Sequence, residues 1–438
     1  MGIWNKTGAP WLYAMLLIMA GLAAAQSPDP DPSQLSRFQE RIRQDLRNIP
    51  NYTCLETIER AHRTPHSRTF KPIDTLRLEV SSVSGKEMFA WPGARQFEDL
   101  DVMSLVTSGT IGSGIYASFA HHLFVVGTGT IQYGGKEHLA GRACVRYEFH
   151  MTQQESSLLL TFNGNSETVA ARGSFWFDPV SLDLMRLDVR AEAIPYSLRL
   201  QDALIQIHYE RVHVGDANAL LPKLSELTMT HFSGEASRAA FEFSQCRAYR
   251  TESTISFDPP PTLPPEVPKP ALRQVDLPAG LLVPVELESA IDSKTARVGD
   301  ALHGRVVQEV RYQGEVAIPL GAAITGRVRK LERGASSAPF AVGIEMSEVE
   351  WEGARATFQG ELVDLDRKSA GSHRPVTYFD GHAYKVLIES GMRGVGIFYL
   401  AASGFHIAPG FRTVWRTLPR SGAATRPALA IPALQHPR

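Results

Sequence analysis

The sequence has only three cysteines among its 438 residues, at Cys54, Cys144 and Cys246. Three are too few for a disulfide scaffold, and these three are too scattered for a metal site. In an oxidising compartment two of them would bond and leave one thiol. We predict the pair Cys54–Cys246, because it would join the beginning of the first domain to its last strand, although the sequence alone does not choose among the three pairs. Closing so long a loop would stabilise the folded state by roughly 4–5 kcal/mol in the chain-entropy model.

Signatures of catalysis, phosphate binding and metal binding are absent as well. Gly112-Ser113-Gly114 lacks the preceding strand and the outer glycine of a nucleophile elbow. Gly134-Gly135-Lys136 is followed by Glu137, where a phosphate loop needs Ser or Thr. The 14 histidines include no pair with a third ligand at a suitable spacing. The sequence therefore predicts a protein that is not an enzyme, with no catalytic residue, no cofactor and no metal. An enzyme would need a cluster created only by folding.

An excess of either charge is also missing, since 45 basic and 46 acidic side chains leave a formal charge of −1. Such a chain has no bulk electrostatic reason to bind nucleic acid. One local asymmetry exists, because no acidic residue follows Glu389 while six arginines do. This pattern is typical either of solvated strand ends with a loose tail or of an anion-binding patch. We predict a disordered basic tail over residues 419–438.

Long apolar runs are confined to the leader. Lys6 precedes an apolar stretch from Trp11 to Ala20, and small residues at Ala23-Ala24-Ala25 end it. This order predicts a cleavable signal peptide over residues 1–25; an uncleaved anchor is the alternative. The stretch is too short for a membrane span, so we expect no transmembrane segment after its removal. The predicted location is the periplasm or the outer envelope.

A proline-rich segment divides the rest of the chain. Prolines crowd between Asp258 and Pro270, a composition that favours a stiff, extended spacer. We therefore predict a first domain over residues 33–257, a linker over 258–274 and a second domain over 275–418.

The first domain opens with a predicted helix and continues with strands. The apolar residues Leu35, Phe38, Ile42, Leu46 and Ile49 recur at helical steps, and Pro50 ends the pattern. Most later segments alternate with period two. The clearest case is a predicted hairpin in which Phe175-Trp176-Phe177 precedes an Asp-Pro turn and the alternating stretch Met185–Ala191.

The second domain also consists of short predicted strands. Leu277-Pro278-Ala279-Gly280 and Ile318-Pro319-Leu320-Gly321 place Pro and Gly as in a type I turn, and a strand follows each. Short strands at this spacing predict a small β-barrel or sandwich. The fold class is therefore mainly β with a few helices.

Large apolar residues in the first domain exceed what one amphipathic helix covers. Either the sheet curls around a filled core, or it encloses an apolar cavity for acyl chains or a hydrophobic peptide. The candidate lining, named from alternation alone, is Trp91, Phe175, Trp176, Phe177, Phe241 and Phe243.

The first domain resembles a known periplasmic group. The residues that carry the resemblance are the leader, the first helix, and Gly173-Ser174-Phe175-Trp176-Phe177-Asp178-Pro179 followed by Leu184–Val189. The hairpin is similar to one in the half-barrels of outer-membrane lipoprotein-sorting (LolA-like) carriers and sigma-factor regulatory proteins. The resemblance covers about Ser33 to Phe257 and is one of pattern. It implies a strongly curved antiparallel half-barrel sheet with helices in its concavity, and binding of a lipid or lipidated protein.

The second domain is similar to the C-terminal barrel of TrbI-like conjugation and type IV secretion proteins. The residues that carry this are Leu277–Gly280, Val283-Pro284-Val285, Val298-Gly299-Asp300 and Ile318–Gly326. The chain departs from that family in its cleavable-looking leader and in the lack of an antenna helix pair. The resemblance therefore implies a barrel used for binding to an envelope partner.

Two functions remain open from the sequence. The first is a non-enzymatic envelope protein that binds a lipid, a lipoprotein or a hydrophobic peptide. The alternative is a structural interaction subunit of an envelope or secretion-type assembly, with a packed first domain and no small-molecule ligand.

Overall fold

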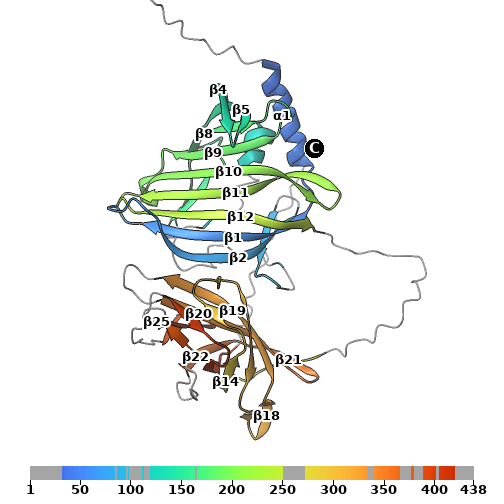
Figure 1. Ribbon diagram of the computed structural model, residues 1–438, viewed down its shortest axis with the longest axis vertical. Helices are drawn as coiled ribbons and strands as arrows, with labels where there is room; N and C mark the ends of the chain where they lie inside the picture. Colours follow the sequence, from blue (N-terminus) through green and yellow to red (C-terminus); the bar gives the residue numbers. More distant parts are fainter. Residues whose placement is uncertain are drawn as a thin grey trace, which may run out of the picture.

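The protein, seen here as a computed structural model, is mainly β, as predicted (Figure 1). The structure describes residues 32–83, 86–94, 97, 111–112, 119–162, 165–249, 272–333, 340–365, 376–378, 388–400 and 404–419. The predicted signal peptide, residues 258–271 of the predicted linker and residues 420–438 of the predicted tail lie outside these ranges. Among the described residues, no helix combines the length and the apolar character needed to cross a membrane.

The N-terminal sheet has ten described strands, in the spatial order β3-β2-β1-β12-β11-β10-β9-β8-β5-β4, and every neighbouring pair is antiparallel. The strands are β1 Tyr52–Arg63, β2 Lys71–Val83, β3 Lys86–Ala90, β4 Thr130–Leu139, β5 Arg142–Met151, β8 Ala170–Phe177, β9 Leu184–Glu192, β10 Leu200–Val214, β11 Ala217–His231 and β12 Ala236–Ala248. A separate hairpin joins β6 Leu159–Phe162 to β7 Asn165–Thr168.

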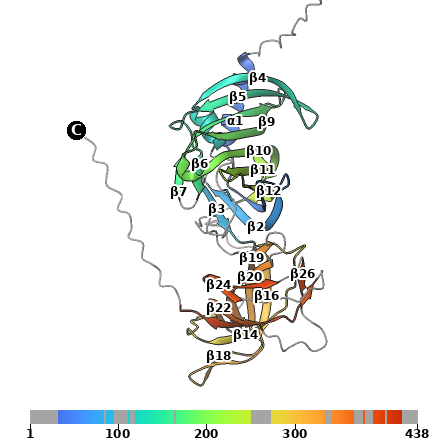
Figure 2. The same ribbon diagram turned by 90° about the vertical axis from the view of Figure 1, so that its left-hand side faces the viewer.

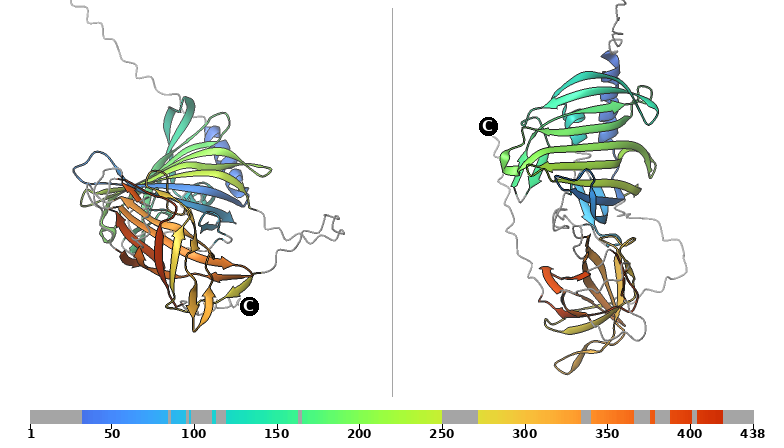
Figure 3. Two further views of the ribbon diagram at one scale, coloured as in Figure 1. Left: turned by 60° about the horizontal axis from the view of Figure 1, so that its bottom comes forward. Right: turned by 60° about the vertical axis from the view of Figure 1, so that its left-hand side comes forward.

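This sheet curls, and α1 (Pro32–Arg47) lies against one of its faces, here called the inner face (Figure 3). The predicted apolar stripe is confirmed, because Phe38 and Ile42 are fully buried. A π-helix, η2 (His122–Val126), packs beside α1, and Arg43 Nε donates a hydrogen bond to the Phe124 carbonyl over 2.9 Å. Gly127, with φ +76°, ends η2 in a left-handed conformation that glycine adopts without strain.

The β8–β9 hairpin forms as its alternation predicts. Phe175 pairs with Leu187, and both side chains are fully buried. Asp178 accepts hydrogen bonds from the backbone of Val180 and Ser181, at 2.8 and 3.1 Å, so its carboxylate holds the turn.

The predicted disulfide between Cys54 in β1 and Cys246 in β12 is confirmed. A register shift places one residue of β1 opposite two of β12, with Gln245 at φ +51°. This bulge aligns the two sulfurs on adjacent strands. Cys144 is a buried free thiol.

The C-terminal sheet follows the order β13-β21-β20-β19-β16-β14-β27-β22, with β25 and β24 added beside β20. Its strands are β13 Arg273–Val275, β14 Leu282–Leu287, β16 Ala301–Val306, β19 Ala323–Arg333, β20 Phe340–Trp351, β21 Ala354–Thr357, β22 Gly360–Leu365, β24 Ile388–Met392, β25 Val395–Leu400 and β27 Arg412–Thr417. Smaller sheets contain β15 Ile291–Asp292, β17 Val310–Tyr312, β18 Glu315–Ile318, β23 Val376–Tyr378 and β26 Phe405–Ile407.

The predicted turns of this sheet are present. Gly280 and Gly321 have φ of +89° and +83°, and a strand begins within three residues of each. Strand β13 starts at Arg273, inside the range predicted as linker.

The two sheets meet where β2 has an edge that β3 does not cover (Figures 1 and 2). Arg77 N donates to the Val298 carbonyl over 2.8 Å, and Val298 N donates to the Thr75 carbonyl over 2.9 Å. Val298 therefore pairs with β2 in a one-residue parallel bridge. Arg77 and Asp300 add an ion pair at 3.4 Å.

Candidate functional site

Aromatic rings gather on the inner face of the N-terminal sheet beneath α1. Phe175 and Phe177 point to this face from β8, and both are fully buried. The Phe38 ring stacks on them at centroid distances of 5.4 and 4.2 Å. Phe124 from η2 meets Phe175 edge-on at 5.1 Å. These two candidate lining residues therefore pack against protein rings contributed by the two helices.

Phe241 and Phe243 share the inner face but lie elsewhere on it. Both belong to β12, which is separated from β8 by β9, β10 and β11. Their cross-strand partners on β1 are Ile58 and Glu56. Both rings are buried, with exposed fractions of 1% and 8%. The structure thus divides the four phenylalanines into two pairs at different places on the face.

Trp176 points to the opposite face, because side chains alternate along β8. Its ring lies 5.7 Å from the Arg146 guanidinium and 5.1 Å from that of Arg186. Its indole Nε1 donates to Glu137 Oε2 over 2.8 Å, and this hydrogen bond is the largest cause of the lowered pKa of Glu137. The structure does not bring Trp176 together with the phenylalanines.

Trp91 follows β3 and lies at the junction of the two sheets. Its ring is contacted by the guanidinium groups of Arg327 and Arg329 from β19, at 5.6 and 5.0 Å. Gly299 has φ +102°, and a Cβ there would lie 2.5 Å from the Arg77 carbonyl oxygen and 3.0 Å from Trp91. Only glycine fits this close approach, so Trp91 is an interface residue apart from the four phenylalanines.

The inner face also carries charged groups that alternation of apolar residues did not reveal. Arg60 on β1 and Asp74 on β2 are cross-strand partners, with side chains only 1% and 4% exposed. Arg60 donates two hydrogen bonds to the Asp74 carboxylate, at 2.7 and 2.5 Å. This bidentate geometry satisfies both buried charges. Charged residues occur on both alternating sets of β1, so the sequence pattern carried no signal for this buried pair.

Glu56 is the second buried charge of β1. Its side chain is on the inner face beside Phe243, and its Oε2 has no hydrogen-bond partner in the described part of the chain. Burial raises the pKa of this carboxyl well above its ordinary value, and the nearby Glu87 raises it further. Burial therefore favours the protonated form of this group, which can donate as well as accept a hydrogen bond among apolar residues.

We expect Glu56→Gln to stabilise the protein at neutral pH. The folded state keeps a proton that the unfolded state releases, so wild-type stability is complete below the ordinary pKa of 4.5 and declines as pH rises above it. The slope is about −1.4 kcal/mol per pH unit until the folded-state pKa is reached. The amide does not titrate, so urea unfolding at several pH values should show a flatter profile for the variant. Equal pH profiles for both proteins would contradict the assignment.

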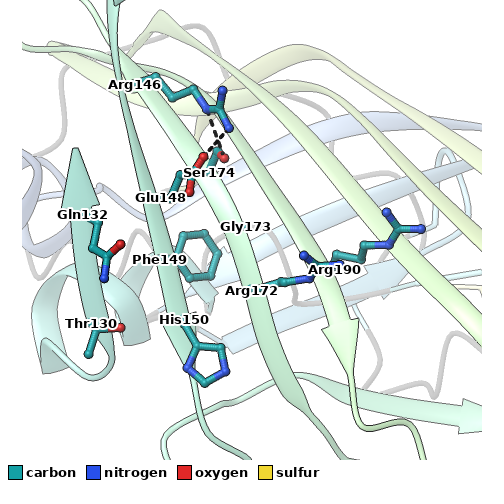
Figure 4. A pocket seen from close by; sticks show the side chains of 10 residues that line it. All are labelled: Thr130, Gln132, Arg146, Glu148, Phe149, His150, Arg172, Gly173, Ser174 and Arg190. Atoms are coloured by element: carbon teal, nitrogen blue, oxygen red, sulfur yellow. Dashed lines mark hydrogen bonds and ion pairs between the residues drawn. The ribbon is translucent and has the colours of Figure 1, made fainter. Parts of the chain in front are cut away.

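A polar pocket of about 380 Å³ lies on the outer face, over β4, β5, β8 and β9 (Figure 4). It is lined by Thr130, Gln132, Arg146, Glu148, Phe149, His150, Arg172, Gly173, Ser174 and Arg190. Each arginine in it has a carboxylate partner, at 2.5 Å for Arg146 and Glu148 and 2.8 Å for Arg172 and Glu192. Arg190 pairs with Asp202 at 2.7 Å. With its cations neutralised, this pocket has no spare charge for an anion, and we assign it no ligand.

Among the residues that the structure describes, no group of three or more His, Cys, Asp or Glu side chains could hold a metal ion.

The chain matches no protein-family model and no curated protein. Several solved structures show a distant likeness, and three of them illustrate it. One, described as an outer membrane lipoprotein-sorting protein domain from Vibrio parahaemolyticus, has a TM-score of 0.28 and 10% identity over 50% of this chain and 92% of that one. A DUF1329 family protein from Desulfovibrio piger has a TM-score of 0.26 and 16% identity over the same shares. The Pseudomonas aeruginosa MucA/MucB complex has a TM-score of 0.16 and 13% identity over 86% of this chain and 93% of that one.

TM-scores this low do not establish a shared fold. The predicted likeness to lipoprotein-sorting proteins has a distant counterpart among these structures. The TrbI-like resemblance of the C-terminal part stays a prediction.

Proposed function

We propose that this is a non-enzymatic binding protein of the periplasm or outer envelope, whose N-terminal sheet holds an apolar ligand on its inner face. The ligand would be a lipid, the acyl chain of a lipoprotein or a hydrophobic peptide. The observation that carries the proposal is the inner face itself, where apolar side chains follow one another from β5 to β2 of one curled sheet. Such a concave apolar surface is the usual setting of a lipid site.

Within that face the Phe241–Phe243 pair is the better place for a ligand. This pair lies four strands along the sheet from Phe175 and Phe177 and belongs to the part closed by the disulfide. We therefore place the apolar ligand over β12 and β1.

The test uses the full chain purified from the periplasm. Organic extraction and mass spectrometry should recover an acyl species, and the delipidated protein should bind a dansyl-labelled undecanoyl amide. Phe243→Ala should weaken this binding about tenfold or more, because burial of a phenylalanine ring contributes about 1.5–3 kcal/mol. Phe398→Ala, which removes a buried ring from the C-terminal sheet, is the matched control and should leave the affinity unchanged.

Two outcomes would count against the ligand site. One is the absence of both an extracted acyl species and probe uptake by the folded protein. The other is an equal loss of affinity in both variants. Circular dichroism establishes that each variant is folded, and Phe243→Met replaces Phe243→Ala if the latter is not.

A second candidate is a structural interaction subunit of an envelope assembly with no small-molecule ligand. It is favoured by the ring stacking between α1 and β8, which fills that part of the inner face. Crosslinking in cells distinguishes the two functions, because an assembly subunit should give one stoichiometric protein partner and no extracted lipid.

A further inference from the structure

Two aromatic rings are exposed together at the end of the N-terminal sheet where β10 begins and β11 ends. Tyr196 is the first residue of the short 3-10 helix η3 (Tyr196–Leu198), and Phe232 directly follows β11. Their exposed fractions are 76% and 55%, and their ring centroids lie 5.4 Å apart. Single exposed apolar residues are common on protein surfaces, but two adjacent rings form a patch whose burial would be favourable.

The backbone around these rings holds them in this exposed position. Leu198 is fully buried and fixes η3 to the sheet, and Arg199 ends η3 in a left-handed conformation with φ +50°. The Arg199 N–H donates to the Tyr196 carbonyl over 2.9 Å, and the Phe232 N–H donates to the Arg199 carbonyl over 3.2 Å. The two rings are therefore presented by hydrogen-bonded segments that bury other residues.

A third exposed apolar side chain lies on the hairpin next to η3. Leu159 on β6 is 54% exposed, and both β6 and β7 pack beside η3 (Figure 2). The Phe162 ring, at the other end of β6, lies 4.9 Å from the ring of His231, the last residue of β11. The hairpin, η3 and the end of β11 thus share one end of the sheet. We call Leu159, Tyr196 and Phe232 the aromatic tip.

Basic residues predominate around the aromatic tip. A Cβ on Gly234, in the turn after Phe232, would lie 3.2 Å from the Pro65 side chain, so the β1–β2 loop lies beside this turn. Arg68 in that loop and Arg199 after η3 are exposed, and neither has an ion-pair partner among the described residues. The basic residues of these segments are Arg63, Arg68, Lys71 and Arg199, and the acidic ones are Glu167 and Glu235.

We propose that the aromatic tip docks the protein on an anionic phospholipid membrane. Tyr196 and Phe232 enter the interface, where aromatic rings are favoured, and Arg68 and Arg199 bind lipid phosphates. A stable protein partner would need about 800 Å² of complementary surface on each side. A few apolar side chains beside unpaired cations suffice for interfacial binding to anionic lipid. This surface is separate from the inner face, so the inference does not depend on an apolar ligand there.

The experiment measures cosedimentation of the full chain, purified from the periplasm, with large unilamellar vesicles. One set is phosphatidylcholine alone, and the other contains one quarter phosphatidylglycerol. We expect binding to the anionic vesicles to be about tenfold or more tighter, because each arginine near an anionic surface contributes about fivefold. Raising the salt from about 0.1 M to about 0.5 M should reduce this preference, since exposed charges are screened.

Tyr196→Ser/Phe232→Ser tests insertion of the rings. We expect it to weaken binding to the anionic vesicles by about tenfold or more, because two apolar side chains no longer leave water. Tyr312→Ser/Val316→Ser is the matched control, since it changes an aromatic and an aliphatic residue that are 43% and 46% exposed on the β17–β18 hairpin. This control should bind both vesicles as wild type does.

Arg68→Gln/Arg199→Gln tests the phosphate contacts. We expect it to lose most of the preference for anionic vesicles and to keep the weak binding to phosphatidylcholine. Arg142→Gln/Arg172→Gln removes the same charge from two exposed arginines that are paired with acidic residues elsewhere on the sheet, and it should keep the preference. Circular dichroism establishes that every variant is folded.

Three results would overturn the proposal. The first is no sedimentation with either vesicle, and the second is an equal loss in the tip variants and their controls. The third is a photocrosslinker at position 196 that captures a protein in cells and no lipid, which would make the tip a protein-binding surface. If the arginine variant loses binding while the aromatic variant keeps it, the contact is purely electrostatic and the insertion of Tyr196 and Phe232 is refuted.

Discussion

Reduction of the Cys54–Cys246 disulfide is expected to lower the free energy of unfolding of the N-terminal sheet by about 5 kcal/mol. The two cysteines are 192 residues apart in sequence, and the bond removes the conformational freedom of that long loop from the unfolded chain. Replacing both with serine should have the same effect. Urea unfolding of the full chain, with and without a reductant, measures the difference.

The chain contains its own control for this experiment. All three cysteines precede residue 250, so the C-terminal sheet has none, and its unfolding transition should not respond to the reductant. Cys144→Ser alone leaves the crosslink in place and should cost far less than its loss. An unchanged midpoint after reduction would show that the bond does not restrain the unfolded state.

Arg60→Met is expected to destabilise the protein by about 3–5 kcal/mol at pH 8, because it leaves Asp74 as an unpaired buried charge. Burial raises the pKa of the Asp74 carboxyl, and the hydrogen bonds from Arg60 oppose this. Without Arg60 the folded state favours the protonated acid. The loss should therefore be smallest near the carboxyl's ordinary pKa of 3.8 and grow as pH rises.

Asp74→Asn should behave differently with pH. It leaves the Arg60 guanidinium buried, and this group stays charged at every accessible pH, so acid gives no relief. The double variant Arg60→Met/Asp74→Leu removes both charges and should recover most of the stability or exceed it by about 1–4 kcal/mol.

The exposed pair Arg172–Glu192 is the control, with side chains 57% and 31% exposed. Removing this ion pair should lower the free energy of unfolding by about 1 kcal/mol or less. If the buried and exposed pairs cost the same, or if the two single variants share one pH profile, the buried pair does not have the energetic role assigned to it. Urea unfolding between pH 4 and 8 provides both measurements.

The elements predicted well from sequence are those with a single dominant pattern. The helical stripe of Phe38 and Ile42 and the alternation around Phe175 and Leu187 each have one way to bury their apolar residues. The disulfide was predicted from the positions of its cysteines at the beginning and in the last strand of the first domain, and the structure makes these strands, β1 and β12, neighbours. Each of these follows from local spacing or from the order of strands.

Strand β1 shows why the polar part of the face could not be predicted. In Cys54-Leu55-Glu56-Thr57-Ile58-Glu59-Arg60, both alternating sets contain apolar and charged residues, so periodicity does not identify the buried one. The buried set includes Glu56 and Arg60 because Asp74 and Phe243 are supplied by other strands. Trp91 could not be placed for a related reason, since its arginine partners come from a distant segment. Trp176 lies on the face opposite Phe175 and Phe177 because side chains alternate along β8.

The pairing of β1 with β12 has a consequence for the order of folding. In chain order, β1 is the first strand of this sheet and β12 the last, and the two are neighbours. The seam between them therefore closes only after the whole intervening segment has been synthesised. Such long-range pairing folds slowly, and until it forms, β1 and β11 each present an open edge that can pair with another chain. A chain that ends before Ala236 should therefore aggregate, while one that reaches Ala248 can complete the seam and lock it by oxidation.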